Sequence, residues 1–154
     1  SLTERHLRSD PPSPEEIQAI SSEVVSAIMH ECASMPSKVP LLVGVGGTVS
    51  VLASMDRGLT SYDPALLDGW CIRPHRLAGL VEQVSRSRHE ERSGQQVIGE
   101  GRADILVAGV LVVALLAERF PAPGLVCSMQ GLRYGLVRVA AGEAMGRPDP
   151  GAGD

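Results

Sequence analysis

Apolar residues recur every three or four positions in the first part of the chain, which is the spacing of one helix face. The apolar positions are Ile17, Ile20, Val24, Ile28 and Cys32. A helix start precedes them, because Ser13 can act as the N-cap, Pro14 suits the first helical position and Glu16 completes a capping box. The pattern therefore predicts a helix over residues 14–33 with one buried face.

Two continuous apolar runs predict buried strands. Residues 39–45 form the first run, which is typical of a strand covered on both faces, and residues 125–128 form the second. A short extended piece is predicted over residues 69–72, after a turn or short helix that begins at residues 62–64. Helical patterns lie between and after these segments, over residues 48–55, 77–84, 105–118 and 131–142.

The predicted helices differ in how much of their surface should be buried. Residues 105–118 are apolar on nearly all sides, so we expect this helix to be buried on nearly all sides. Residues 85–96 are polar and carry both charges, which indicates a solvated loop with room for a helical turn of its own. The charge run Glu90, Glu91 and Arg92 within it is interpreted as a solvated turn. The Pro- and Gly-rich residues 144–154 are expected to form a disordered tail.

The recurring order of strand, turn and helix predicts an α/β architecture with parallel strands. Only two strong strands accompany at least four helices. Two short strands cannot cover the apolar faces of that many helices. Either weak strands escape notice, or the sheet is completed by material outside this chain.

Composition narrows the classes of function. The 154 residues suffice for one domain, and 44% hydrophobic residues indicate a globular protein. Aromatic residues make up 3% and the net charge is −4, so neither base stacking nor a basic footprint supports nucleic-acid binding. Any anionic ligand must therefore be held locally.

The cysteines, the histidines and the apolar runs exclude further classes. Cys32, Cys71 and Cys127 are odd in number and set among apolar neighbours, which indicates buried, reduced thiols in a cytoplasmic protein rather than disulfides or zinc. The four histidines lack metal-ligand spacing, and we assign them no role. The longest apolar run, residues 105–117, is too short to span a bilayer, and the N-terminus shows no signal-peptide pattern. We expect a soluble, cytoplasmic protein without a membrane partner.

The most informative segment is Leu-Leu-Val-Gly-Val-Gly-Gly-Thr-Val at residues 41–49, where a strand empties into glycines just before a helix. Such a turn brings backbone N–H groups close to a ligand and aims the positive end of the helix dipole at an anion. The other interpretation is that any strand-to-helix turn can use glycines. A dinucleotide fingerprint would need glycine where Val49 stands, and a P-loop would need a lysine, whereas Lys38 is the only lysine and precedes the strand.

Several segments together resemble the exopolyphosphatase and guanosine pentaphosphate phosphatase family. They cover nearly all of the chain to about residue 140, in the order that the family shows. They are Leu2-Thr3-Glu4-Arg5, Ser9-Asp10-Pro11-Pro12, Gly46-Gly47-Thr48 with Leu52-Ala53, Tyr62-Asp63-Pro64, Arg102-Ala103-Asp104 with Ala108-Gly109, and Ser128 with Gly131-Leu132-Arg133-Tyr134-Gly135. The resemblance implies an actin-like (ribonuclease H-like) fold, of which residues 1–143 would form the second, C-terminal lobe with an incomplete sheet flanked by helices.

The resemblance also implies a function. The family hydrolyses phosphoanhydrides of inorganic polyphosphate or of guanosine penta- and tetraphosphate, with a catalytic carboxylate and magnesium. Its catalytic glutamate, its two phosphate loops and its metal-binding aspartate lie upstream of a segment like residues 2–5, so the Mg²⁺ ligands are expected outside this chain. The expected partners are the substrate and either the missing N-terminal lobe or a second copy of the chain.

The lobe that remains would position the substrate. Gly46, Gly47 and Thr48 would donate backbone hydrogen bonds, and Arg102 could clamp phosphate oxygens bidentately. The alternative for Arg102 is a contact with Asp104 or with the helix terminus, and Asp104 itself is interpreted as a first-turn acid. The alternative for the whole chain is a non-catalytic, regulatory module that binds a nucleotide or polyphosphate. Gln130 and Tyr134 depart from the family pattern and put polar contacts at their turn in doubt.

Overall fold

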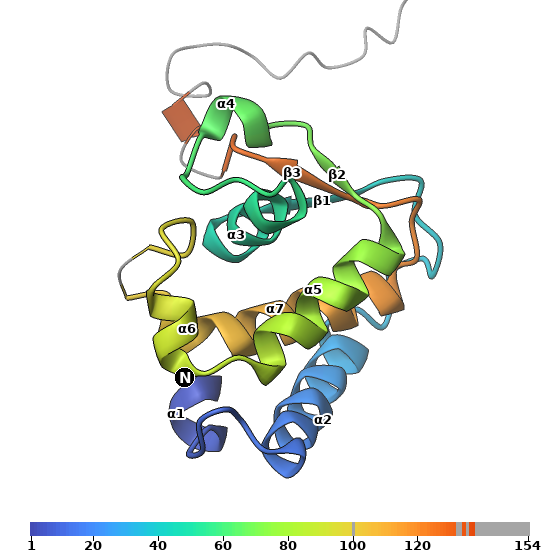
Figure 1. The fold of residues 1–154 in the computed structure, drawn as a ribbon. Coiled ribbons are helices and arrows are strands. Elements are labelled where there is room, and N and C mark those ends of the chain that lie inside the picture. The colour runs from blue at the N-terminus through green and yellow to red at the C-terminus, as the bar shows by residue number, and fades with distance from the viewer. Residues whose placement is uncertain (100, 132–133, 135, 138–154) are drawn as a thin grey trace, which may run out of the picture.

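The computed structural model describes residues 1–99, 101–131, 134 and 136–137 (Figure 1). Its elements occur in the order α1 (Leu2–His6), α2 (Pro14–Glu31), β1 (Leu42–Val45), α3 (Gly47–Asp56), α4 (Pro64–Leu67), β2 (Cys71–Ile72), α5 (Pro74–Arg86), α6 (His89–Ser93), α7 (Ala103–Arg119) and β3 (Leu125–Ser128). These bounds confirm the predicted helices and strands up to residue 128 within a few residues. The helix predicted over residues 131–142 falls largely outside the described residues, and the predicted tail lies wholly outside them.

The described strands form one small sheet in the order β1-β3-β2. β1 and β3 run parallel, with Leu42 opposite Leu125 and Val45 opposite Ser128. β2 pairs antiparallel with β3, so the prediction of a purely parallel sheet is wrong. β2 has only two residues, and this is too short to produce the alternation of polar and apolar residues by which strands are recognised in a sequence.

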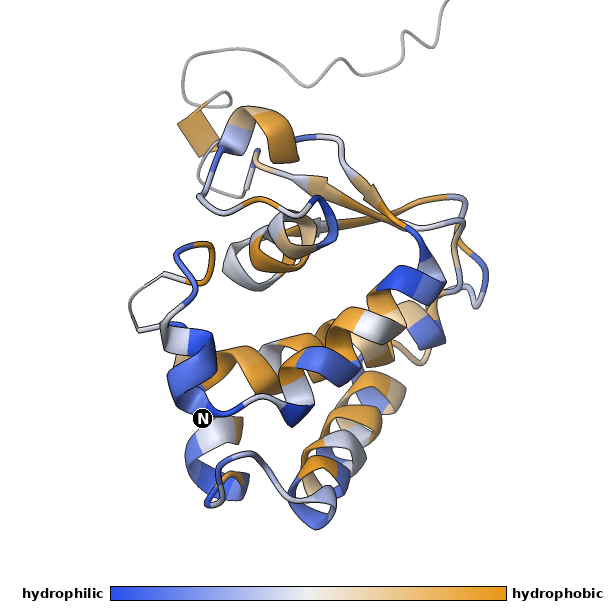
Figure 2. Cartoon of the chain, in the orientation of Figure 1, coloured by the Kyte–Doolittle hydropathy of each residue, from blue (hydrophilic) through white to orange (hydrophobic). Residues whose placement is uncertain are grey.

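Most of the helices are stacked in layers below one face of this sheet, whereas the short α4 is drawn above the strands (Figure 1). α3 lies directly against the strands, α5 and α7 pack against α3 and against each other, and α1 and α2 lie beyond α7. Figure 2 shows why this order is stable: α7 is hydrophobic along most of its length and lies between other elements, whereas α1 and α6 are largely hydrophilic. No helix among the described residues has the length and hydrophobicity needed to cross a membrane.

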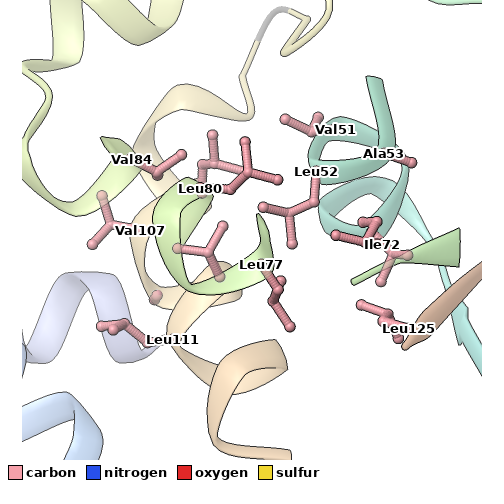
Figure 3. Packing of buried hydrophobic residues seen from close by; sticks show 14 of the residues in the cluster. Val51, Leu52, Ala53, Ile72, Leu77, Leu80, Val84, Val107, Leu111 and Leu125 are labelled. Atoms are coloured by element: carbon pink, nitrogen blue, oxygen red, sulfur yellow. The ribbon is translucent and has the colours of Figure 1, made fainter. Parts of the chain in front are cut away.

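The core lies where α3 meets α5, α7 and the sheet (Figure 3). Leu52 of α3 sits at its centre and has no exposed surface. The low content of aromatic residues means that branched aliphatic side chains fill this volume. The surrounding buried side chains include Val51, Ile72, Leu77, Leu80, Val84, Val107, Leu111 and Leu125.

The expectation that the strand at residues 39–45 is covered on both faces is wrong. Val43 and Val45 are 50% and 52% exposed, because α3 covers only the opposite face of β1. A continuous apolar run shows that both faces are hydrophobic, but not that both have a neighbour within the described residues. The expectation for α7 needs a smaller correction. Ile105 is 52% exposed, and residues 112–117 are only half-buried.

The three cysteines are free, but only Cys127 is buried. Burial raises the pKa of its thiol, and the nearby charge of Asp68 raises it further. Cys32 is half-buried and Cys71 is exposed, so the expectation of three buried thiols is wrong for these two. Cys71 lies opposite Val126, on the sheet face that also carries the exposed valines of β1.

Glu16 ties the start of α2 to the segment before it. Its carboxylate accepts hydrogen bonds from the backbone N–H groups of Ser13 (2.8 Å), Arg8 (2.7 Å) and Ser9 (3.0 Å), and from the hydroxyl of Ser9. The Ser9 hydroxyl, followed by the Ser13 amide, lowers the pKa of Glu16 to about 2. The predicted capping box is thus confirmed, and it also fixes the preceding turn.

Glu16 should make the stability of the protein depend on pH in the acid range. Its pKa is lower in the folded chain than in the unfolded chain, so its contribution is present above about pH 4.5 and is lost as the pH falls through about 2. We expect the thermal midpoint of Glu16→Gln to fall less than that of the wild type between these pH values. Glu82→Gln, whose carboxylate faces Arg86 on an exposed helix face, is the matched control and should follow the wild type. Parallel curves for Glu16→Gln and the wild type would contradict this role.

Candidate functional site

A groove of about 730 Å³ lies at the carboxyl ends of the two parallel strands, where α3 begins. Ligands of open α/β sheets bind at this edge, because the helices that follow the strands start there. The groove is lined by Val45, Gly46, Gly47, Ser50, Tyr62, Arg102, Ser128, Met129, Gly131, Tyr134 and Val137. Four regions of the sequence, residues 45–50, 62, 102 and 128–137, therefore contribute to one cavity.

The three glycines of the turn have different tasks. A Cβ at Gly44 would lie 2.7 Å from Cγ2 of Val49, so this glycine lets α3 pack closely on β1 and has no part in the groove. Gly46 is the N-cap of α3 and has φ of +96°, which side chains disfavour. A Cβ at Gly47 would lie 3.2 Å from Cζ of Arg102, so this glycine makes room for the guanidinium.

The first turn of α3 offers donors to the groove. The Ser50 amide is the first to bond back, to the carbonyl of Gly46 at 3.1 Å, so the amides of Gly47, Thr48 and Val49 have no acceptor within the helix. α3, which the structure describes completely, has no acidic residue in its first turn and no side-chain cap. The positive end of its dipole is therefore not neutralised by the helix itself.

The side chain of Arg102 lies against this turn. It is the N-cap of α7, is exposed, and has its guanidinium beside Gly47. The alternative was a contact between Arg102 and Asp104, and the structure shows no such ion pair between these two described residues. The Asp104 carboxylate instead pairs with Nε2 of His89 at 2.8 Å. The structure thus brings an arginine and the glycine turn to the same cavity.

Thr48 has its side chain outside the groove. Its Oγ1 lies 2.6 Å from where a Cβ of Gly109 would be, so the side chain packs on the backbone of α7. Of the four residues expected at the site, Gly46, Gly47 and Arg102 line the cavity, whereas Thr48 can contribute only its backbone N–H.

Sequence reasoning missed several residues of the groove. The Ser50 hydroxyl donates to the Gly46 carbonyl at 3.0 Å and contacts Sδ of Met129, which closes the turn from inside the groove. Both tyrosines of the chain, Tyr62 and Tyr134, also line it, although the composition argued against aromatic recognition. Both stand within segments that carry the family resemblance, and that was the signal that could have placed them. The Met129 amide donates to Oδ1 of Asp68 at 2.8 Å, which fixes the chain as it leaves β3.

Arg92 is not part of a solvated turn, as its charge run had suggested, but is only 5% exposed. Its Nε donates to the carbonyl of Ala103 at 3.0 Å, and its Nη1 donates to the carbonyl of Ser87. Burial lowers the pKa of its guanidinium, and the charges of Asp10, Asp104 and Glu91 oppose that shift. The expectation failed because the acceptors are backbone carbonyls, which no charge pattern reveals.

The groove is positive rather than acidic. Among the described residues that line it, Arg102 is the charged one, and the others are glycines, serines, tyrosines and apolar side chains. The described part of the chain holds no group of three or more His, Cys, Asp or Glu residues that could bind a metal ion. The lining of this groove therefore suits an anion and does not fit a magnesium site, which needs carboxylate and other oxygen ligands.

Comparison with known proteins agrees with the geometry. A family model described as the Ppx/GppA phosphatase family matches residues 1–142. Exopolyphosphatase 2 of Mycobacterium tuberculosis is 27% identical over 118 residues, which are 76% of this chain and 37% of that protein. This chain thus spans well under half the length of the curated relative it matches.

Solved structures show the same architecture. An exopolyphosphatase-like protein superimposes with a TM-score of 0.85 at 25% identity, over 92% of this chain and 47% of that one. A Ppx/GppA family member from Aquifex aeolicus gives a TM-score of 0.81 at 25% identity, over 95% of this chain and 47% of its own. The likeness confirms the actin-like (ribonuclease H-like) α/β fold expected from the sequence.

Proposed function

Because the chain belongs to the Ppx/GppA phosphatase family, we propose that it serves as the substrate-positioning lobe of a phosphoanhydride hydrolase of the exopolyphosphatase type. The single observation that carries the proposal is the convergence of the glycine turn at residues 46–47 and Arg102 on one groove. Backbone amides at a helix start and a guanidinium are the groups that proteins use for phosphate oxygens. Among the lining residues that the structure describes, none is acidic and would oppose an anion.

The proposed division of labour follows from what the groove contains. Gly47 and Thr48 would donate their amides to phosphate oxygens, and Arg102 would hold the same chain from the other side. The catalytic carboxylate and magnesium would belong to the lobe that the resemblance places upstream, where magnesium would offset the charge of the transferred phosphoryl group. The residues of this chain would then bind and orient the substrate without taking a proton from water.

The substrate class is part of the proposal. Inorganic polyphosphate and guanosine penta- or tetraphosphate both present a chain of phosphate oxygens to such a groove. Because this chain spans 37% of the curated relative and 47% of the solved structures, the activity of the whole protein would need the rest of such a molecule. A second copy of this chain is the other partner that we propose. We also propose a cytoplasmic location, where these substrates occur.

Arg102→Ala should weaken the binding of tripolyphosphate to the chain by about tenfold, because one charge-assisted contact is worth roughly 1.5–3 kcal/mol. Isothermal titration calorimetry at two salt concentrations measures this loss, and the salt dependence of the affinity should fall with it. Arg86→Ala is the matched control, since Arg86 pairs with Glu82 on the exposed face of α5 and does not line the groove.

Equal affinities of Arg102→Ala and the wild type would remove Arg102 from the site. The non-catalytic module remains the other candidate, because a groove whose described lining holds no carboxylate can bind an anion without hydrolysing it. Magnesium-dependent release of phosphate from polyphosphate by the chain alone would contradict the proposed division of labour.

A further inference from the structure

We propose that Arg92 is a positioning residue that holds the start of α7, and with it Arg102, at the edge of the groove. This inference rests on the function proposed for Arg102 and adds a residue that does not line the groove. Arg92 lies in α6 and is the one charged residue among the buried residues of the described chain. A buried guanidinium needs a reason, because its transfer out of water is costly unless its donors are satisfied.

The contacts of Arg92 join three helices. Nη1 donates to the carbonyl of Ser87, the C-cap of α5, and Nε donates to the carbonyl of Ala103, the first residue of α7, at 3.0 Å. The planar guanidinium can reach both carbonyls at once because its donors point in fixed, different directions. The end of α5 is thereby connected to the beginning of α7 through one side chain.

The carboxylates around Arg92 strengthen this connection. Asp10 accepts the amide proton of His89 at 2.7 Å, and Asp104 pairs with Nε2 of the same histidine at 2.8 Å. Both aspartates also attract the charge of Arg92, which partly offsets the effect of burial on its pKa. The short helix α6 is therefore fixed to the N-terminal segment on one side and to α7 on the other.

Gly99 and Gly101, the described residues just before Arg102, provide no side chain to hold it in place. Gly99 and Gly101 both have positive φ, at +76° and +74°, and neither has an atom within 4 Å of where a Cβ would be. The Arg102 amide reaches the carbonyl of Gly99 only at 3.4 Å. The hydrogen bond from Arg92 to Ala103, the residue after Arg102, is thus the closest polar anchor described for this end of α7.

A double-mutant cycle tests this role, with tripolyphosphate as the probe and calorimetry as the measurement. Arg92→Met removes both donors. Arg92→Lys keeps the charge but lacks the planar guanidinium that donates to both carbonyls at once. We expect Arg92→Met to weaken binding by about the same tenfold as Arg102→Ala, and Arg92→Lys by about threefold. In the Arg102→Ala background neither substitution should weaken binding further, because the group it positions is gone.

Arg119→Met is the matched control. Arg119 lies at the other end of α7 and donates to the backbone carbonyls of Cys32 and Met35, each at 3.4 Å. Its loss should lower the thermal midpoint, as the loss of Arg92 does, but leave the affinity and its salt dependence unchanged. A merely structural role for Arg92 would make the two arginine variants alike in binding.

The outcomes separate this inference from the proposed function. If Arg102→Ala itself leaves binding unchanged, the function proposed for the groove fails. If Arg102→Ala weakens binding but the Arg92 variants do not, or if the losses simply add in the double mutants, the positioning role is overturned. Should Arg92→Met not fold, Arg92→Lys with and without Arg102 decides the question in the same way.

Discussion

Gly47→Val is expected to lower the affinity for tripolyphosphate by about a hundredfold, which corresponds to roughly 3 kcal/mol. A Cβ at this position would lie 3.2 Å from Cζ and Nε of Arg102, so the branched side chain would displace the guanidinium. It would also cover the unpaired amides of the first turn of α3. The loss should therefore exceed that of Arg102→Ala, which leaves those amides accessible. Calorimetric titration of both variants measures the difference.

The chain itself should survive this substitution. The atoms nearest to the added Cβ belong to the end of a flexible arginine side chain, which can move away. Gly79→Val in α5 is the matched control, because no atom lies within 4 Å of a Cβ at Gly79 and this residue does not line the groove. It should bind like the wild type. Unchanged binding by Gly47→Val would show that the groove does not take the anion at this turn.

Leu52→Ala is expected to destabilise the fold by about 2–5 kcal/mol, the range for emptying a fully buried leucine position. Leu52 has no exposed surface and lies between α5 and the sheet at the centre of the core (Figure 3). The aliphatic side chains around it cannot close the cavity without leaving their own contacts. Urea denaturation, followed by the fluorescence of the single tryptophan, measures the free energy of unfolding.

Leu66→Ala provides the comparison for Leu52→Ala. Leu66 also lies in a helix, so the change in helix propensity is similar. Unlike Leu52, however, Leu66 is 40% exposed. We expect its effect to stay within about 0.5 kcal/mol. Equal losses for the two variants would mean that the packing around Leu52 is looser than the structure shows.

The elements of this fold were predictable where local chemistry fixes them. Ser13, Pro14 and Glu16 mark the start of α2 by their own side chains, and the glycines after Val45 mark the start of α3. The burial of individual side chains was less predictable, because it depends on which other elements pack against them. Val43 and Val45 read as core residues, yet the face of β1 that they form has no cover within the described residues.

The candidate site was predictable only in part, for the same reason. Gly46, Gly47 and Arg102 were found from a resemblance that spans the chain, and the structure brings them to one groove. The side chain of Thr48 turned out to face α7, because a neighbour distant in sequence, Gly109, leaves room for it there. Arg92 escaped notice because its partners are backbone carbonyls, which carry no signature in a sequence.

The close contact between Thr48 and Gly109 has a consequence for how a ligand would be received. It interlocks the first turn of α3 with the middle of α7, the helix whose N-cap, Arg102, lines the groove together with Gly46 and Gly47. Because such close packing leaves little room for sliding, we expect Arg102 and the glycine turn to keep their relative positions. The binding site for an anion would then be preorganised, and binding would not carry the entropic cost of ordering these two elements.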